Sequence, residues 1–415
     1  MSLRPLLVFL MVVMSFVKCS TAFCFTPTCL LQSAESSRHF VGHNGASSSL
    51  LATATATSSS SSPSVLCIGD ALFDCIANDN VCSIEDMMML TNAWTAWPGG
   101  APANVATALC KLGTTSAFAG CLGADTDGDA IQNLLEQTGV DVTLLQRTDK
   151  YPTRRVMVIR DQVSGDRVFA GFYDGKSADA FADAYFDMTV TLQNEAAEAV
   201  IMRAKYLVCS TLSLAFETSR KAVNDIVNRG LAGGARLYVD VNWRDVFWTN
   251  HEETVARQTI LEFAQRAHIV KLTDEEAHWL LGISASDALA KPELVAQAFP
   301  HACAVLVTAG EKGASYSIVG HTGKVEPFHV TVLETTGAGD AFTAGFIHGL
   351  LSLNLDIVMF NEQVPCEDQP EVIQNIVRLA AAVGALTCTS EGAIAAQPTF
   401  DEVESFLIHG QKVWT

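Results

Sequence analysis

Short apolar runs alternate with amphipathic stretches along the chain from residue 65 onward. The runs are rich in β-branched residues and bounded by turn signals, which predicts strands that are buried on both faces of a sheet. The clearest runs are Val65–Ile68, Tyr206–Cys209, Leu237–Val239, Ile269–Leu272 and Ala304–Val307.

The stretches between these runs predict helices with recognisable ends. The candidates are 102–113, which Pro102 opens, 127–138, and Glu217–Arg229. A glycine closes each of them, as is common at helix C-termini. The closing residues are Gly113, Gly139 and Gly230. Alternating strands and helices predict an α/β fold of three layers, with a mainly parallel central sheet flanked by helices on both faces.

Extended segments interrupt this alternation early in the chain. Arg154–Arg160 and Arg167–Tyr173 flank a Ser-Gly-Asp turn, which predicts a hairpin. Asp74–Val81 is a further extended candidate. Extended pieces inserted into a chain of strands and helices predict a small β lid over the carboxyl edge of the sheet, built from about residues 74–98 and 151–175.

The N-terminal residues have the composition of targeting segments. The apolar run Leu6–Val17 has twelve residues. A helix of that length rises only about 18 Å, well short of the roughly 30 Å core of a bilayer. We therefore expect a signal peptide over residues 1–22, cut after Ala22, and not a membrane anchor. Residues 23–63 are rich in Ser, Thr and Ala and poor in acidic residues, which predicts a disordered transit peptide.

The junction between these two segments indicates a destination. Ser20–Pro27 resembles the bipartite plastid presequence of algae with complex plastids, in which an aromatic residue follows the signal-peptide cut. We therefore expect a plastid protein whose folded domain spans residues 64–410, with secretion as the alternative. The nine cysteines beyond the presequence are odd in number and form no C-x-x-C pair, which argues against secretion and against a structural zinc site.

Charge excludes some partners. The formal net charge is −19, and because residues 1–62 carry +2, the remainder carries −21. No run of Lys or Arg offsets this charge, so we expect no nucleic-acid partner, and no membrane partner once the presequence is removed. An anionic substrate must therefore be bound through local donors.

The most informative motif is Glu334–Asp340, which reads ETTGAGD. Alternation over Phe328–Val332 predicts a strand before it, and the apolar residues after it predict a helix. The amides of Gly337 and Gly339 can close on an anion there, helped by the positive end of the helix. Asp340 would stand close enough to take a proton from an attacking hydroxyl. An ordinary helix-capping Asp is the alternative.

A second glycine-rich turn, Pro98–Asn104, reads PGGAPAN. Gly99 and Gly100 leave room for a ligand against the backbone, and Asn104 offers a donor and an acceptor to a hydroxyl. An ordinary loop before a helix is the alternative. The GAGD turn is not a Walker A loop or a dinucleotide-binding G-x-G-x-x-G, because no lysine follows its last glycine and the glycine spacing differs.

Together these motifs resemble the two signatures of the PfkB (ribokinase-like) carbohydrate kinases, and most closely those of fructokinases. The resemblance covers about residues 65–408 and implies the three-layer ribokinase-like fold, with ATP and Mg²⁺ as cofactors. It implies that Asp340 is the catalytic base. The anion hole would be Gly337, Ala338 and Gly339, and the sugar site would be Asp74, Gly99, Gly100 and Asn104.

The same resemblance implies a nucleotide side of the site. The ATP-binding candidates are Asn242, Arg244, Thr308, Gly310, Gly313 and Gly384. Glu276 falls in the family's N-x-x-E position, which organises Mg²⁺ through water, and Mg²⁺ does prefer carboxylates and retained waters. The alternatives are a surface loop for Asn242 and Arg244, and for Glu276 an acidic cluster that stabilises a helix N-terminus.

Four positions depart from the family pattern. Glu334 replaces the first Asp of D-T-x-G-A-G-D, a position that borders a monovalent-cation site, so K⁺ is left as an open candidate. Thr273 replaces the Asn of N-x-x-E, and Ala381 replaces an adenine-side Asn. Asp174 stands where plant-type fructokinases have Arg in the lid, which reverses the charge near the sugar.

The leading hypothesis is an ATP-dependent sugar kinase that phosphorylates fructose, with ribose, 2-keto-3-deoxygluconate or a nucleoside as alternative substrates. A homodimer formed through the lid is a candidate assembly. A second hypothesis is a plastid fructokinase-like protein that acts as an interaction partner in the transcription machinery. A third, a secreted lectin-like sugar binder, leaves the GAGD turn unexplained. Retention of Asp340 and Asn104 favours catalysis.

Overall fold

The computed structural model describes residues 63–78, 83–89, 93–160, 167–191 and 195–409. The chain divides into two units, residues 1–61 and 62–415. The predicted signal peptide and all but the last residue of the predicted transit peptide lie outside the described residues. Within the described part, no helix is long and apolar enough to cross a membrane.

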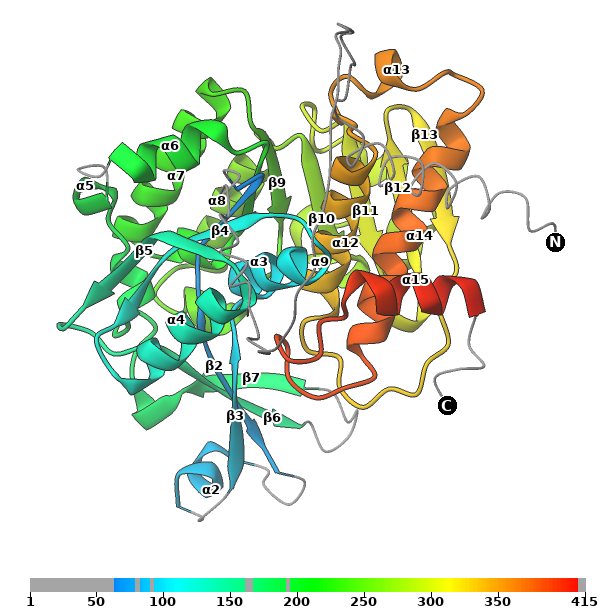
Figure 1. Ribbon diagram of the computed structural model, residues 1–415. Coiled ribbons are helices and arrows are strands. Elements are labelled where there is room, and N and C mark those ends of the chain that lie inside the picture. Colours follow the sequence, from blue (N-terminus) through cyan, green and yellow to red (C-terminus); the bar gives the residue numbers. More distant parts are fainter. Residues whose placement is uncertain (1–62, 79–82, 90–92, 161–166, 192–194, 410–415) are drawn as a thin grey trace, which may run out of the picture. The chain divides into compact units, whose positions relative to one another are not determined.

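A nine-stranded sheet forms the centre of the folded unit (Figure 1). Its order is β13 (His321–Val325), β12 (Ala314–Ile318), β11 (Ala304–Thr308), β10 (Ile269–Thr273), β9 (Arg236–Asp240), β8 (Tyr206–Ser210), β1 (Val65–Ile68), β4 (Ser116–Gly123) and β5 (Asp141–Thr148). The strands from β11 to β5 run parallel, and β12 and β13 are antiparallel. The mainly parallel sheet predicted from the apolar runs is confirmed.

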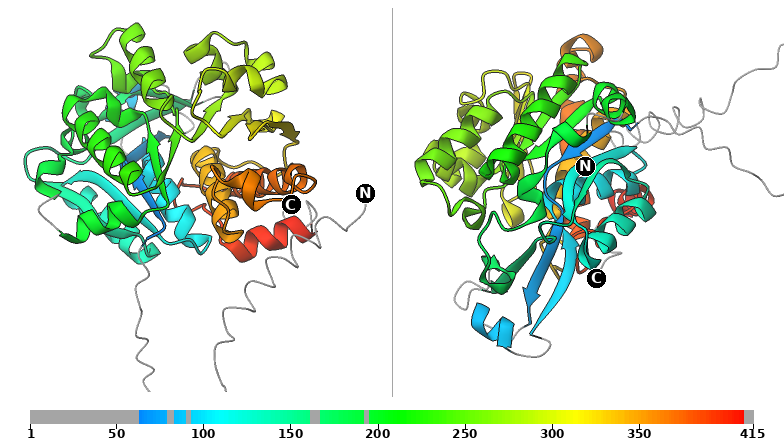
Figure 2. Two further views of the ribbon diagram at one scale, coloured as in Figure 1. Left: turned by 90° about the horizontal axis from the view of Figure 1, so that it is seen from above. Right: turned by 90° about the vertical axis from the view of Figure 1, so that its left-hand side faces the viewer.

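Helices cover both faces of this sheet, which gives the three predicted layers (Figure 2). One face carries α3 (Ala101–Lys111), α4 (Thr126–Thr138), α12 (Ala338–Ser352), α14 (Gln369–Thr387) and α15 (Phe400–His409). The other carries α6 (Glu195–Arg203), α7 (Glu217–Ala232), α8 (Glu253–Ala264), α9 (Asp274–Leu281), α10 (Ala285–Ala290) and α11 (Pro292–Ala296). The remaining short helices are η1 (Tyr173–Gly175), η2 (Ala182–Tyr185), α5 (Met188–Thr191), η3 (Leu212–Ala215), η4 (Asp245–Trp248), η5 (Gly310–Lys312) and α13 (Phe360–Gln363).

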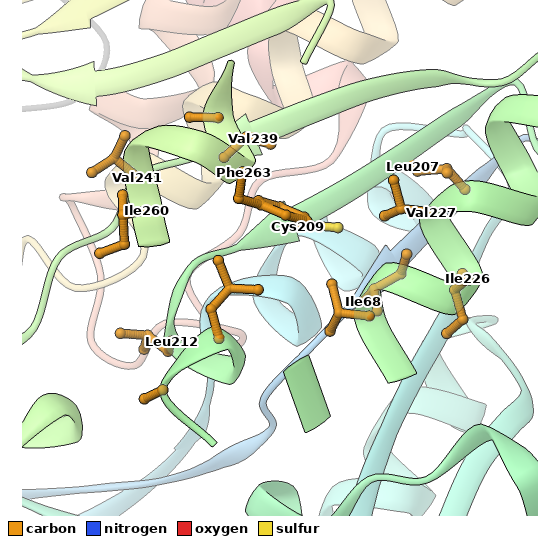
Figure 3. Packing of buried hydrophobic residues seen from close by; sticks show 14 of the residues in the cluster. Ile68, Leu207, Cys209, Leu212, Ile226, Val227, Val239, Val241, Ile260 and Phe263 are labelled. Atoms are coloured by element: carbon orange, nitrogen blue, oxygen red, sulfur yellow. The ribbon is translucent and has the colours of Figure 1, made fainter. Parts of the chain in front are cut away.

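Buried apolar side chains join the sheet to the α7 and α8 layer (Figure 3). Ile226 and Val227 of α7 and Phe263 of α8 are buried in the same cluster as Leu207 and Val239 of the strands. Each such side chain removed from water stabilises the fold by about 1.5–3 kcal/mol. The β-branched runs that signalled strands therefore also supply the core.

Gly230 has a different role from the predicted one. Helix α7 continues past it to Ala232, so the expected end at Arg229 is wrong. A Cβ atom on Gly230 would lie 2.6 Å from Cδ1 of Leu207 in β8. The glycine therefore allows helix α7 to approach the sheet closely, and it does not end the helix.

A second, four-stranded sheet has the order β3 (Trp94–Gly99), β2 (Leu72–Ala77), β6 (Arg155–Arg160) and β7 (Arg167–Phe172). The pairs β2–β3 and β6–β7 are antiparallel, and β2–β6 is parallel. The short helix α2 (Ile84–Met89) follows β2 at the tip (Figure 1). The predicted hairpin is confirmed, although its turn lies outside the described residues, as do residues 79–81 of the Asp74–Val81 candidate.

The strand predicted over Phe328–Val332 is wrong. That segment is irregular, and the preceding strand, β13, ends at Val325. Apolar and polar residues alternate in this segment, but no described strand pairs with it, and Val332 and Leu333 are exposed. An irregular segment, and not a strand, therefore leads into the GAGD turn.

Candidate active site

The two sides of the central sheet meet at β1. From β1 the chain goes on through β4 to β5 on one side, whereas β8 to β11 follow one another on the other side. In parallel α/β sheets, ligands bind beside such a switch point, at the carboxyl ends of the strands. The hydroxyl of Ser210, which ends β8, donates a hydrogen bond to Oδ1 of Asp70, just after β1, at 3.1 Å.

The GAGD turn forms the N-terminus of a fifteen-residue helix, α12. Gly337 caps it with φ of 81°, a left-handed conformation that residues with a Cβ atom rarely adopt. A Cβ atom there would also lie 3.0 Å from the carbonyl oxygen of Ala393. The first amides of α12 and its helix dipole together make this turn, residues 337–339, suited to an anion. We call it the anion turn.

Asp340 and Asn104 lie in direct contact. The Nδ2 group of Asn104 donates a hydrogen bond to Oδ2 of Asp340 at 2.8 Å, joining residues 236 positions apart in the sequence. Asn104 is buried in the first turn of α3, and its Oδ1 atom has no hydrogen-bond partner within the described residues. The structure thus brings together one residue of each glycine motif and leaves an acceptor beside them.

The surroundings of Asp340 raise the pKa of its carboxyl group to about 7. Burial has the largest effect, followed by the negative charge of Asp240. The hydrogen bond from Asn104 and the positive charges of Lys271 and Arg244 act in the opposite direction. A carboxylate with a pKa near neutrality is a far better general base than one with an ordinary pKa near 4.

Asp74 lies on β2 against the end of β3. A Cβ atom on Gly99 would come within 2.5 Å of Oδ2 of Asp74, and one on Gly100, whose φ is 99°, within 2.6 Å of the carbonyl oxygen of Asp70. The two glycines therefore make room first for the chain's own aspartates. Burial, and then the charge of Asp70, raise the pKa of Asp74 to about 7. Burial also raises the pKa of Asp70, a residue that no motif singled out, to about 6.

The loop after β9 carries Asn242 and Arg244. Asn242 has a left-handed φ of 41°, which few residues with a Cβ atom adopt. The guanidinium of Arg244 lies 5.0 Å from the ring centre of Phe169 on β7, so it touches the second sheet. Its charge lowers the pKa of both Asp74 and Asp340. Arg244 therefore touches the second sheet and acts electrostatically on Asp74 and Asp340.

Glu276 uses both carboxylate oxygens to hold backbone amides. Oε1 accepts from the amide of Trp243 and Oε2 from the amide of Thr273, each at 2.8 Å. The Thr273 hydroxyl accepts in return from the amide of Glu276, which forms a capping box at the start of α9. One lone pair on each oxygen remains, and this suits a hydrogen bond from a metal-bound water. Glu276 therefore fits Mg²⁺ held through water.

The other nucleotide-side candidates lie on two different elements. Thr308 ends β11, and Gly310 and Gly313 shape the turn to β12 with φ of 50° and 88°. Gly384 lies in α14, where a Cβ atom would be 3.0 Å from the carbonyl oxygen of Ala338. Gly384 therefore lets α14 pack closely against the anion turn.

Glu334 is buried under the same turn. Its Oε2 atom accepts a hydrogen bond from the amide of Gly392 at 2.9 Å. A carboxylate and several main-chain carbonyls are the ligands that hard cations take from proteins. Glu334 stands at a position where the family pattern has Asp. The carboxylate keeps its negative charge, and that charge lies one methylene further from the backbone.

Sequence reasoning missed one pair of charges. Lys271 of β10 donates a hydrogen bond from Nζ to Oδ2 of Asp240, the last residue of β9, at 2.7 Å, and both side chains are buried. The available signal was a lysine inside the otherwise apolar strand IVKLT.

Comparison with known proteins agrees with this geometry. The profile of the pfkB family carbohydrate kinases matches residues 62–400. "Probable fructokinase-4" of Arabidopsis thaliana is 32% identical over 343 residues, which cover 83% of this chain and 96% of that protein. "Probable fructokinase-6, chloroplastic", from the same plant, is 30% identical over 348 residues, covering 84% and 83%.

Solved structures give the same result. Fructokinase with bound ATP from Xylella fastidiosa superimposes with a TM-score of 0.69 at 28% identity, over 83% of this chain and 98% of that one. A fructokinase double mutant from Vibrio cholerae O395, in a fructose-, ADP- and potassium-bound form, gives a TM-score of 0.66 at 26% identity, over 84% and 99%. Because the family profile matches most of the chain, the protein belongs to the pfkB family of carbohydrate kinases.

Proposed function

We propose that this protein transfers the γ-phosphoryl group of ATP to a primary hydroxyl of fructose. The observation that carries the proposal is the hydrogen bond from Asn104 to Asp340, which joins the second glycine motif to the anion turn. Relatives along the whole domain are fructokinases, and two of the similar structures hold ATP, or fructose with ADP.

In this mechanism Asp340 takes the proton from the sugar hydroxyl. The hydroxyl oxygen then forms a bond to the γ-phosphorus, the bond between that phosphorus and the β,γ-bridging oxygen breaks, and ADP leaves. The amides of Gly337 to Gly339 stabilise the negative charge on the transferred group. With a pKa of about 7, Asp340 can hold the proton and release it after each turnover.

Mg²⁺ would be bound by the ATP phosphates and by water molecules hydrogen-bonded to Glu276. When bound, the metal neutralises charge on the β- and γ-phosphates. Arg244, which lies 3.9 Å from Oε1 of Glu276, would orient the phosphates from the lid side. K⁺ would bind near Glu334, outside the path of the proton.

The sugar side favours a neutral substrate. Asp74 and Asp70 are buried carboxyl groups, and Asp174 of the lid adds a third, exposed one. A carboxylated sugar such as 2-keto-3-deoxygluconate would bring a further negative charge to this region. Fructose, ribose and nucleosides carry none, and Asp74 and Asn104 can accept hydrogen bonds from their hydroxyl groups.

We also propose that the enzyme works in a plastid. The composition of residues 1–63 supports this location, and one relative of similar length carries the word chloroplastic in its name. A fusion of residues 1–63 to a fluorescent protein should enter the plastid of an alga with complex plastids. Accumulation outside the cell would contradict the proposal.

A coupled assay for ADP release tests the function directly. Fructose should give a higher kcat/KM than ribose, 2-keto-3-deoxygluconate or a nucleoside. Asp340→Asn should lower kcat by about 10²–10⁴-fold, because a general base contributes about that much. The matched control is Asp401→Asn, an exposed carboxyl in the first turn of α15, which should retain wild-type kcat.

Two outcomes would overturn the proposal. The first is that none of these sugars is phosphorylated by protein that is folded and binds ATP. The second is turnover that is unchanged in Asp340→Asn. Co-purification with the plastid RNA polymerase, without turnover, would instead support the interaction-partner hypothesis.

A further inference from the structure

A buried ion pair lies in the middle of the central sheet, where apolar residues are expected. Lys271 and Asp240 face each other in register across β10 and β9. Their Nζ and Oδ2 atoms are 2.7 Å apart, and the side chains are only 5% and 6% exposed. Taking two charges out of water costs several kcal/mol per ion, and their mutual attraction recovers only part of it. A pair in this position therefore needs a reason beyond stability.

The pair lies directly against the anion turn. A Cβ atom on Gly339 would be 2.9 Å from Nζ of Lys271, closer than a real side chain could come. The ammonium group of Lys271 therefore occupies space that the Cβ atom of any larger residue at position 339 would need. This contact brings a full positive charge against the backbone that is to hold a phosphoryl group.

The pair also has unused hydrogen-bonding capacity. An ammonium group has three donors, and within the described residues Lys271 makes one hydrogen bond, to Asp240. Oδ1 of Asp240 is buried and has no partner in the same part of the chain. The two remaining donors of Lys271 are therefore available to an anion at the turn.

We propose that Lys271 and Asp240 are positioning residues. Lys271 supplies a fixed positive charge behind the anion turn, which helps the turn to bind phosphate. Asp240 holds the Lys271 side chain in place and offsets part of its charge, so that Asp340 stays a usable base. The proposal rests on the kinase activity proposed above. It assigns roles to two residues that act through the turn and through Asp340.

The electrostatics of Asp340 support this assignment. The ionisable and hydrogen-bonding groups that face or sense Asp340 come from α3, β1, β2, β9, the loop after β9, and β10. They are Asn104, Cys67, Asp74, Tyr238, Asp240, Arg244 and Lys271. Among them Asp240 raises the pKa of Asp340, whereas Lys271 and Arg244 lower it.

These signs give opposite predictions for the two members of one pair. Without the positive charge of Lys271, the pKa of Asp340 rises, so the acid limb of the kcat/KM profile moves to higher pH. Without the negative charge of Asp240, the same limb moves to lower pH. A merely structural role would weaken the enzyme in both variants and would not move the limb in opposite directions.

The test measures kcat/KM for fructose between pH 5 and 9 in four proteins: wild type, Lys271→Met, Asp240→Asn and the double variant. The acid limb should move up by about 1 pH unit in Lys271→Met and down by a similar amount in Asp240→Asn, which is the usual effect of one close charge. The double variant should return toward wild type.

A matched control uses another ion pair of the same composition. Lys221 and Asp225 form an exposed pair at 2.9 Å on α7. Lys221→Met and Asp225→Asn therefore repeat both substitutions far from the anion turn and should leave the acid limb where it is. Shifts of the same sign in Lys271→Met and Asp240→Asn, or no shift in either, would overturn the proposal.

Binding of ADP gives a second measurement that does not need turnover. Calorimetry should show about a tenfold loss of ADP affinity in Lys271→Met, as expected when one charge-assisted contact of about 1.4 kcal/mol is lost. Asp240→Asn should bind ADP at least as tightly as wild type. Should Lys271→Met fail to fold, Asp240→Asn alone decides: a weaker affinity or an unmoved acid limb would overturn the proposal. Absence of sugar turnover in wild type would count against the proposed function, and the ADP measurement would still judge the charge pair.

Discussion

Two buried ion pairs in this protein have similar geometry and different surroundings. Arg154 and Asp183 pair at 2.8 Å at the base of the second sheet, and we call them the lid-base pair. Lys271 and Asp240 pair at 2.7 Å behind the anion turn, and we call them the site pair. All four side chains are almost fully buried, and each pair leaves at least one polar atom without a partner in the described residues.

The neighbours of the two cations differ. The guanidinium of Arg154 lies 4.6–5.3 Å from the centres of four aromatic rings, and its Nη2 group donates to the carbonyl oxygen of Ala178 at 2.8 Å. The rings are those of Phe172, Phe181, Phe216 and Phe247. Cation–π contacts of this kind favour cohesion. Lys271 instead meets the backbone of Gly339, where a charge can act on a ligand.

The comparison shows that burial alone does not determine what an ion pair does. The lid-base pair holds the second sheet at its base, and the site pair sets the charge beside the anion turn. The distinction predicts that loss of the lid-base pair lowers stability without moving the pH dependence of Asp340, and that loss of the site pair moves that pH dependence. Loss of Arg154 tests that distinction directly, and Asp340→Asn and Lys176→Ala test the underlying electrostatics with smaller expected effects.

Arg154→Met should lower the free energy of unfolding by about 3–5 kcal/mol, because it leaves the Asp183 carboxylate buried without its partner. Urea denaturation measures this change. Protein that remains folded should keep the wild-type acid limb in its kcat/KM profile, since Arg154 is not among the strong influences on Asp340.

The control for this variant is Arg229→Met. Arg229 pairs with Glu198 at 3.1 Å but both side chains are well exposed, so its loss should cost no more than about 1 kcal/mol. A shifted acid limb in Arg154→Met, or equal destabilisation in the two variants, would remove the distinction between the pairs.

Asp340→Asn should stabilise the fold at alkaline pH. The folded protein holds the Asp340 proton up to a pKa of about 7, whereas the ordinary value is 3.8. The native state therefore binds more protons between those values, and its stability falls as the pH rises through 7. Asn cannot ionise, so the gain in Tm over wild type should be larger at pH 8 than at pH 5. Asp225→Asn should show no such difference between the two pH values.

Lys176→Ala should have the smallest effect. Lys176 and Asp174 form an exposed pair in the lid with Nζ and Oδ2 3.8 Å apart. Such pairs contribute about 0–1 kcal/mol, and salt screens them. The change in unfolding free energy should therefore vanish in 0.5 M NaCl. A large or salt-independent loss would show that exposed and buried ion pairs in this protein do not differ in their contribution to stability.

Much of the architecture could be predicted because the signals were local. The run Val65–Ile68 matches β1 residue for residue, and the other apolar runs fall within their strands. The glycine motifs also identified Asn104 and Asp340, which the fold then brought into contact. Each of these signals depends on residues that are neighbours in the sequence.

The failures depend on partners that a local pattern does not contain. Phe328–Val332 has the alternation of a strand, but it lies beside no other strand. In the sequence, Gly230 resembles a helix terminus. In the structure, Leu207 lies so close to it that a side chain at position 230 would clash. Lys271 could be noticed as a charge in an apolar strand, but its contact with Gly339 exists only after β10 and α12 have packed together.

The contact between Asn104 and Asp340 spans 236 residues, and this has a consequence during synthesis. Ribosomes add about 5–20 residues per second, so roughly 10–50 s separate the appearance of the two side chains. A nascent chain that has completed β1 and α3 therefore holds the Asn104 amide with no Asp340 carboxylate beside it. In the proposed mechanism such a chain lacks its base, so we expect a precursor cut short before α12 to be inactive.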